Sequence, residues 1–94
     1  MINVCKPFSL GQVVATPGAL AALRELGEDG KAYLDRHVRG DWGELSQDDW
    51  KLNDDALQSG DRLLSSYRLN NGTRLWIISE ADRSVTTLLL PDEY

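Results

Sequence analysis

The stretch from residue 62 to residue 90 constrains the fold most, because it predicts three successive β-strands joined by two tight turns. Its apolar, aromatic and β-branched side chains favour a pleated, half-buried surface. The strands are predicted at residues 62–69, 73–80 and 84–90. Asn71-Gly72 lies between the first two, and Asn-Gly favours a two-residue type I′ hairpin turn. The stretch therefore predicts an antiparallel meander.

The register of the first hairpin follows from the charges that flank its turn. With a two-residue loop, Arg68 pairs with Leu75 and Tyr67 pairs with Trp76. A three-residue loop sets Arg68 directly opposite Arg74, and like charges in that position destabilise a sheet. We therefore expect the two-residue loop, with Tyr67 stacked on Trp76 and the two arginines on opposite faces of the sheet.

Three helices are predicted between residues 16 and 60, each with its own start and stop signal. A residue that caps helix N-termini precedes each one, and glycine or a polar break follows it. The caps are Thr16, Asp29 and Ser46, and the helices end at Gly27, near Val38 and at Gly60. Residues 8–16 predict a fourth strand. We expect an α+β fold (β-α-α-α-β-β-β), with the three N-terminal helices packed on one face of a three- to four-stranded antiparallel sheet.

Length and cysteine usage bound the class of protein. The chain of 94 residues, without internal repeats, predicts a single domain over residues 1–94. It has no apolar run of about 18 residues and no signal-peptide pattern, so we expect a cytoplasmic protein that does not enter membranes. One cysteine, Cys5, and one histidine, His37, argue against an internal disulfide and a Cys/His zinc site. We expect no metal and no cofactor.

The acidic character of the middle of the chain is the main indication of function. The net charge is −5, and residues 25–61 hold 11 acidic and 4 basic side chains, a balance of −7. Such a surface disfavours direct DNA binding and favours docking on a basic protein surface, including one that normally holds nucleic acid. The predicted partner-binding residues are Asp41, Trp42, Glu44, Asp48, Asp49, Asp54 and Asp55.

Trp42 has two interpretations. It lies in Gly40-Asp41-Trp42-Gly43, and a tryptophan between glycines either closes the core or anchors a partner. The first interpretation follows from the usual burial of large aromatic side chains. The second makes Trp42 the desolvated centre of the acidic surface.

A catalytic interpretation rests on four residues. His37 titrates nearest neutral pH and suits general acid–base chemistry, while Arg68 or Arg74 suits a phosphate and Thr87 supplies a hydroxyl. Each residue also has a structural interpretation. His37 then packs on the sheet, the arginines lie on a solvated strand face, and Thr87 is an ordinary strand residue.

Two resemblances add to these interpretations. Residues 37–43 (HVRGDWG) and 74–94 (RLWIISEADRSVTTLLLPDEY) resemble a family of small uncharacterised bacterial proteins of plasmids and integrative elements, some labelled as restriction-modification subunits. The layout of Arg36-His37, an arginine-bearing hairpin and Thr86-Thr87 is similar to ribonuclease toxins of the barnase, EndoU, colicin and RelE type. The first resemblance implies a mobile-element origin, and the second implies RNA cleavage.

The leading hypothesis is a small acidic accessory protein of a mobile element that binds a basic host or element-encoded protein, with anti-defence action against a nucleic-acid-binding complex. The alternative is a metal-independent endoribonuclease that uses His37 as general acid or base. A third hypothesis is a structural protein that associates with itself through an exposed sheet edge.

Overall fold

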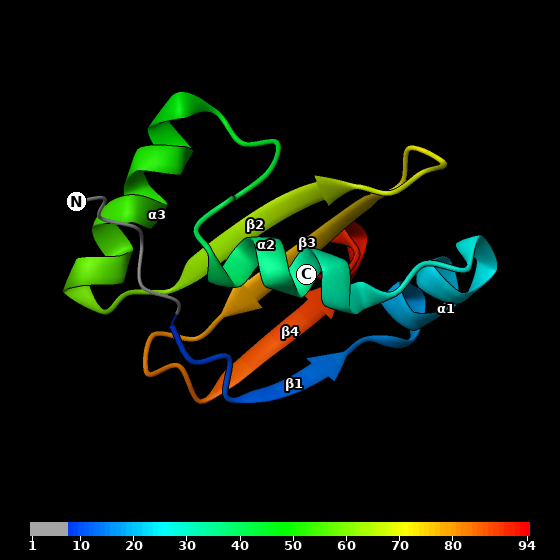
Figure 1. Cartoon of the computed structure of the whole chain (residues 1–94), viewed down its shortest axis with the longest axis horizontal. Helices are drawn as coiled ribbons and strands as arrows, with labels where there is room; N and C mark the ends of the chain where they lie inside the picture. Colours follow the sequence, from blue (N-terminus) through cyan, green and yellow to red (C-terminus); the bar gives the residue numbers. More distant parts are fainter. Residues whose placement is uncertain (1–7) are drawn as a thin grey trace.

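The structure is a computed structural model that describes residues 8–94, and it confirms an α+β fold (Figure 1). The elements in chain order are β1 (Gln12–Ala15), α1 (Pro17–Leu26), α2 (Gly30–Val38), α3 (Gln47–Ser59), β2 (Leu63–Arg68), β3 (Arg74–Ser79), β4 (Val85–Leu89) and the short 3₁₀ helix η1 (Pro91–Glu93). No helix within residues 8–94 combines the length and the apolar character that crossing a membrane requires.

The predicted helix boundaries are confirmed, because they depend on local signals. Thr16, Asp29 and Ser46 are the N-caps, and each side chain accepts a hydrogen bond from a backbone N–H of the following turn. Gly27 and Gly60 end α1 and α3 in the left-handed conformation, with φ of 63° and 82°.

The sheet is mixed, which corrects the expectation of a purely antiparallel sheet. Its strand order is β1-β4-β3-β2. The meander β2-β3-β4 is antiparallel as predicted, but β1 runs parallel to β4, with Val14 beside Thr87. A parallel pair needs a long connection between its strands, and here all three helices and the hairpin provide it.

The predicted register of the first hairpin is wrong by one residue. Arg68 lies directly opposite Arg74, and Tyr67 lies opposite Leu75. Tyr67 and Trp76 therefore occupy opposite faces of the sheet, whereas the two arginines share a face. The predicted Tyr67–Trp76 stack does not form.

Three features explain this register. The Gly72 N–H donates to the Leu69 carbonyl at 2.8 Å, and Gly72 has a φ of 89°, which makes a three-residue loop with glycine in the left-handed position. Arg83 is the only non-glycine among residues 8–94 with positive φ, so Asn71 does not adopt the type I′ conformation. The Glu44 carboxylate lies 3.0 Å from the Arg68 guanidinium and 3.7 Å from that of Arg74, which offsets their repulsion.

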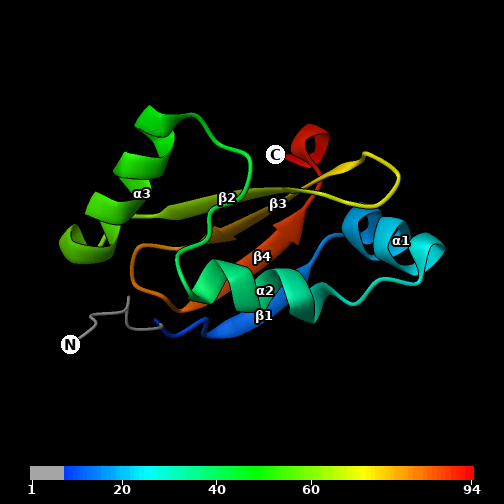
Figure 2. The ribbon, with the colours of Figure 1, turned by 45° about the horizontal axis from the view of Figure 1, so that its top comes forward.

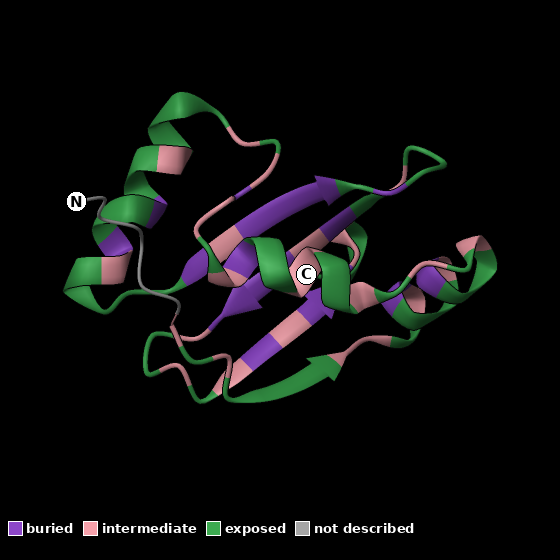
Figure 3. Ribbon diagram, in the orientation of Figure 1, coloured by how far each residue is buried: buried purple, intermediate pink, exposed green. Residues whose placement is uncertain are grey.

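Burial decides between the two registers. The observed pairing places a whole set of alternating side chains on the face that the helices cover. Much of the ribbon of β2 and β3 is buried (Figure 3). The strand residues of that face, all nearly or fully buried, are Leu63, Ser65, Tyr67, Leu75, Ile77, Ser79, Thr86 and Leu88. A shift of β2 by one residue would turn its members of this set, Leu63, Ser65 and Tyr67, toward the other face.

The helices do not all cover one face, which corrects the predicted layout. α2 crosses the sheet face, where Tyr33 packs on Tyr67 with ring centroids 5.5 Å apart (Figures 1 and 2). α1 packs at one end of the same core through Ala19 and Leu23. α3 lies at the β2 edge of the sheet, where the Asn53 amide bonds both backbone groups of Leu64. The opposite face receives only a partial cover from the C-terminal segment, where Tyr94 meets Trp76 edge to face.

Candidate functional site

His37 lies in the interior between α2 and the sheet, with 0% of its surface exposed. Its Nδ1 lies 2.5 Å from the Ser65 Oγ, and its Nε2 lies 3.0 Å from the Ser79 Oγ. Phe8 and Trp42 enclose the ring, with centroids 5.3 and 5.6 Å away. Both ring nitrogens are therefore occupied by side chains of the protein.

The environment of His37 keeps its imidazole neutral. Burial, together with the positive charge of Arg83, lowers the pKa of His37 to about 4. The hydrogen-bond chain continues from Ser79 to the Thr86 hydroxyl at 2.7 Å, and Thr86 donates to the Leu10 carbonyl at 2.8 Å. This arrangement fixes the ring between α2, β2, β3 and β4, and it offers no open position for a substrate.

The structure does not bring the four catalytic candidates together. His37 lies on the helix-covered side of the sheet, whereas Arg68, Arg74 and Thr87 lie on strand positions of the opposite face. Both arginines lie beside the Glu44 carboxylate, and this pairing leaves each side chain about half exposed. A phosphate held by either arginine would be separated from His37 by the sheet.

Trp42 is a core residue, which confirms its interpretation as a plug and corrects its assignment to the partner-binding surface. It is 0% exposed and packs with Ala56 and Leu63. Its Nε1 donates to the Asp54 carboxylate at 3.0 Å, so its polar atom is satisfied as well. Trp42 thereby joins α3 to the sheet instead of pointing to solvent.

The acidic residues predicted to bind a partner divide into two groups. Four of them already hold another residue of the chain. Asp41 pairs with Arg36 at 2.7 Å, which lowers its pKa, Glu44 pairs with Arg68, Asp54 accepts from Trp42, and Asp55 pairs with Lys51 at 3.3 Å. Asp48 and Asp49 are exposed in the first turn of α3 and form no ion pair with any residue from 8 to 94.

A groove of about 260 Å³ lies between α3 and β2, beside these two carboxylates. Its lining consists of Leu45, Asp49, Leu52, Asn53, Arg62 and Leu64. Leu52 stands at its margin with 64% of its surface exposed. Sequence reasoning missed this groove. The available signal was Leu52 itself, an apolar residue outside the stripe of Trp50, Asn53 and Leu57 that turns α3 toward the core.

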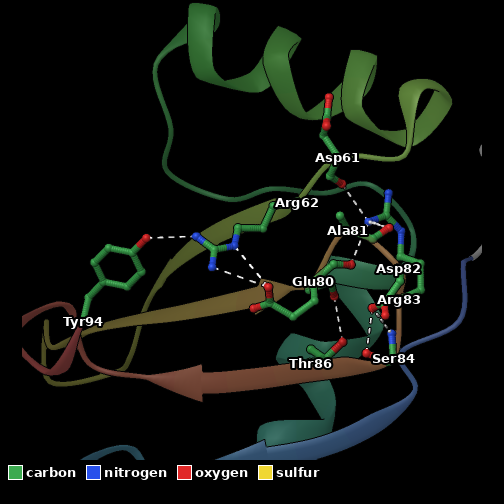
Figure 4. Close-up of polar contacts among 10 residues, drawn as sticks. Asp61, Arg62, Glu80, Ala81, Asp82, Arg83, Ser84, Thr86 and Tyr94 are labelled. Atoms are coloured by element: carbon green, nitrogen blue, oxygen red, sulfur yellow. Dashed lines mark hydrogen bonds and ion pairs between the residues drawn. The ribbon is translucent and has the colours of Figure 1, made fainter.

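Arg62 forms one wall of the groove. Its side chain is held by neighbours on the sheet face that points away from α2 (Figure 4). Its guanidinium donates to the Tyr94 hydroxyl at 3.0 Å and lies 3.4 Å from the Glu80 carboxylate. The carboxylate of Glu80 is the main reason that the pKa of Arg62 is raised above its usual value. This cation is therefore neutralised by the protein itself.

Arg83 fixes the C-terminal end of α3. It adopts a left-handed φ of 61° at the β3–β4 turn. From there its guanidinium donates to the carbonyl of Asp61 at 2.7 Å (Figure 4). It also donates to the carbonyl of Ala56 at 3.2 Å. The carbonyls at a helix C-terminus need such donors. Arg83 therefore ties the last turn of α3 to the β3–β4 turn.

Within residues 8–94, no three His, Cys, Asp or Glu side chains are grouped in a way that would hold a metal ion. Comparisons with protein-family models, with curated proteins and with solved structures give no match to this chain. The two resemblances seen in the sequence therefore stay expectations, and the geometry of α3 is the basis for a functional proposal.

Proposed function

We propose that this chain is a small binding protein whose α3 surface docks on a basic surface of another protein. The α3 surface consists of Asp48, Asp49, Leu52 and the groove beside them. The observation that carries the proposal is the combination of two exposed carboxylates that form no ion pair with residues 8–94 and an exposed leucine at the rim of a groove.

The charge of this surface determines which kind of partner it attracts. The sequence of α3, residues 47–59, contains four aspartates and one lysine, a balance of −3, and Lys51 is already paired with Asp55. Asp48 and Asp49 therefore present uncompensated charge, which steers a Lys/Arg-rich surface toward α3 and repels phosphate. Because basic protein surfaces commonly hold DNA or RNA, binding here would compete with nucleic acid.

Apolar contact supplies what exposed charge lacks. Exposed ion pairs contribute only about 0–1 kcal/mol each, so a charged surface alone makes a weak and unselective interface. Leu52 offers an exposed aliphatic side chain, and Leu45 and Leu64 lie in the adjoining groove. An aliphatic or aromatic side chain of the partner would enter the groove, with its neighbouring cations on Asp48 and Asp49.

The surface is also fixed before binding. Asn53 ties the middle of α3 to Leu64, Asp54 holds Trp42, and Arg83 binds the last turn. A surface that is ordered in the free protein loses little conformational entropy on association. The proposal therefore assigns these three residues the role of holding the surface in place, and Asn53 also lines the groove.

The test is an NMR titration of the labelled chain with a Lys/Arg-rich peptide that carries one leucine, and with a Glu-rich peptide of equal length. We expect amide shifts at Asp48, Asp49, Leu52 and Leu64 with the first peptide and none with the second. Replacement of Asp48 and Asp49 by asparagine should remove most of the shifts. Shifts that are spread over the whole surface, or confined elsewhere, would refute the assignment of the site to α3.

A further inference from the structure

The two edges of the sheet are treated differently in this fold. On the β2 edge, the Trp42 carbonyl accepts from the Ser66 N–H at 3.0 Å, and the Glu44 N–H donates to the Ser66 carbonyl at 2.6 Å. Gly43 makes this approach possible, because a Cβ there would lie 2.1 Å from the Ser66 carbonyl oxygen. With Asn53 on Leu64, the outward backbone groups of Leu64 and Ser66, two of the three outward positions of β2, are paired.

Residues 8–94 provide no comparable cover for the β1 edge. The N–H groups of Gln12 and Thr16 donate at 2.9 Å to the carbonyls of Ser84, just before β4, and of Leu88 in β4, so the alternating backbone groups of Val13 and Ala15 point away from the sheet. Among residues 8–94, no backbone group bonds to them. Val13 and Val14 are 44% and 38% exposed.

The sequence of β1 lacks the features that normally prevent strand addition. Natural edge strands are protected by charges, proline, bulges or a covering segment. Gln12–Ala15 contains no charged residue and no proline, and its centre is a pair of β-branched residues. This edge is therefore prepared to receive another strand.

We propose that β1 pairs with β1 of a second copy of this chain, antiparallel about a two-fold axis at Val14. In this register Val13 of each copy exchanges backbone hydrogen bonds with Ala15 of the other, which uses all the outward groups of the strand. The two Val14 side chains face each other as the central non-hydrogen-bonded pair. Gly11, at a φ of 65°, and Pro17, without an N–H, limit the pairing to this short segment.

Symmetry favours a second copy as the partner, and the absence of charge on β1 permits the contact. The outward groups at positions 13 and 15 are placed equally about residue 14, so an identical strand complements them in an isologous contact. The chain carries −5, and like charge opposes self-association through most of its surface, but residues 12–16 are uncharged. Contact through β1 also leaves the two α3 surfaces apart, since α3 lies at the other edge of the sheet (Figure 1).

Cysteine cross-linking tests the register. In a Cys5→Ser background, Val14→Cys should form a disulfide-linked dimer under mild oxidation. The two-fold axis brings the two Cβ atoms close to the separation that a disulfide requires. Gln12→Cys, on the same strand, should not, because the register places it opposite Thr16 of the other copy. Equal cross-linking of both variants, or none for Val14→Cys, would overturn the proposed register.

Sedimentation tests the dimer itself, over concentrations from about 10 μM to about 1 mM, since a small interface of this kind binds weakly. We expect wild type to shift from monomer to dimer as concentration rises. Val14→Lys should remain a monomer with an unchanged circular dichroism spectrum, whereas the matched exposed variant Leu52→Lys should dimerise like wild type. Wild-type protein that stays monomeric at every concentration, or Val14→Lys that dimerises normally, would contradict the proposal.

Discussion

The interior around His37 and Trp42 and the surface of α3 use polar side chains for opposite purposes. In the interior, every polar side-chain atom of His37, Ser65 and Trp42 has a partner from the chain, and these residues are closed to solvent. On α3, Asp48 and Asp49 are open and have no ion pair with a described residue. The residues with the most distinctive chemistry therefore stabilise the fold, and ordinary surface residues are left to bind.

This difference has a measurable consequence. Changes in the interior should reduce stability and affect binding only through unfolding, because buried polar and aromatic groups are costly to remove. Changes on α3 should reduce binding while the free energy of unfolding stays nearly constant. An interior variant that loses binding while it keeps its stability, or an α3 variant that loses stability, would show that the two regions are not independent.

The largest expected effect is that of Trp42→Ala. Truncation of a fully buried tryptophan removes the contacts with Ala56 and Leu63 and leaves a cavity, which typically costs about 3–5 kcal/mol. Urea denaturation measures this loss. Trp42→Phe keeps most of the ring but removes the donor to Asp54 and should cost less. A Trp42→Ala variant as stable as wild type would contradict the burial of this side chain.

The pH dependence of stability tests the state of His37. Its pKa is lowered from 6.5 to about 4 in the folded chain, so between these values the unfolded chain binds more protons. Stability is thus fully present above pH 6.5 and is lost as the pH falls toward 4, with about 2 kcal/mol lost between about pH 7 and about pH 5.

The matched control for this effect is His37→Gln, which cannot titrate. The variant is expected to be less stable at neutral pH, but its stability should change less between about pH 7 and about pH 5 than that of wild type. Parallel stability curves for the two proteins would show that His37 is protonated in the folded chain, contrary to this account.

Asn53→Ala should have an intermediate effect. Its amide donates to the Leu64 carbonyl at 2.6 Å and accepts from the Leu64 N–H at 3.1 Å, and both bonds are lost in the variant. Because two partly buried backbone groups lose their partners, we expect a cost of about 1–2 kcal/mol. Hydrogen exchange at the Leu64 amide should accelerate, and an unchanged rate would indicate that α3 does not hold this edge.

Leu52→Ala should have the smallest effect on stability. Leucine and alanine have similar helix propensities, and the side chain is 64% exposed, so we expect a change within about 0.5 kcal/mol. Affinity for the leucine-containing basic peptide should nevertheless fall. If the variant lost stability but kept its affinity, Leu52 would belong to the core and not to the binding surface.

Local signals in the sequence were sufficient for the helices and for the strands of the meander. The caps Thr16, Asp29 and Ser46 act within one turn, so sequence alone predicts where each helix begins. The hairpin register was different. Its two arginines are bridged by Glu44, which lies 24 residues before Arg68 in the chain. A comparison of registers that considers only the hairpin residues does not include Glu44.

The candidate site could be predicted only in part, because it too depends on contacts between residues that are distant in sequence. Its charge is visible in the sequence, but the burial of Trp42 and His37 depends on distant residues. Ser65 and Ser79, which hold the His37 ring, are 28 and 42 residues away from it. The parallel position of β1 is likewise a long-range property, because three helices and the hairpin separate it in sequence from its partner β4.

The account predicts that α3, and not net charge in general, recognises a basic partner. The most direct test compares association rates for the fluorescently labelled leucine-containing basic peptide between Asp48→Asn/Asp49→Asn and Glu25→Gln/Asp92→Asn. Both double variants remove two negative charges, so the net charge changes from −5 to −3 in each. Glu25 and Asp92 are exposed residues outside α3. Asp54 stays unchanged because it holds Trp42.

At low ionic strength, the Asp48/Asp49 variant should associate several-fold more slowly than wild type, and the Glu25/Asp92 variant should keep most of the wild-type rate. Added salt should slow wild type until the difference between the proteins disappears. Equal slowing of the two double variants would show that only total charge matters, and it would contradict the assignment of the binding site to α3.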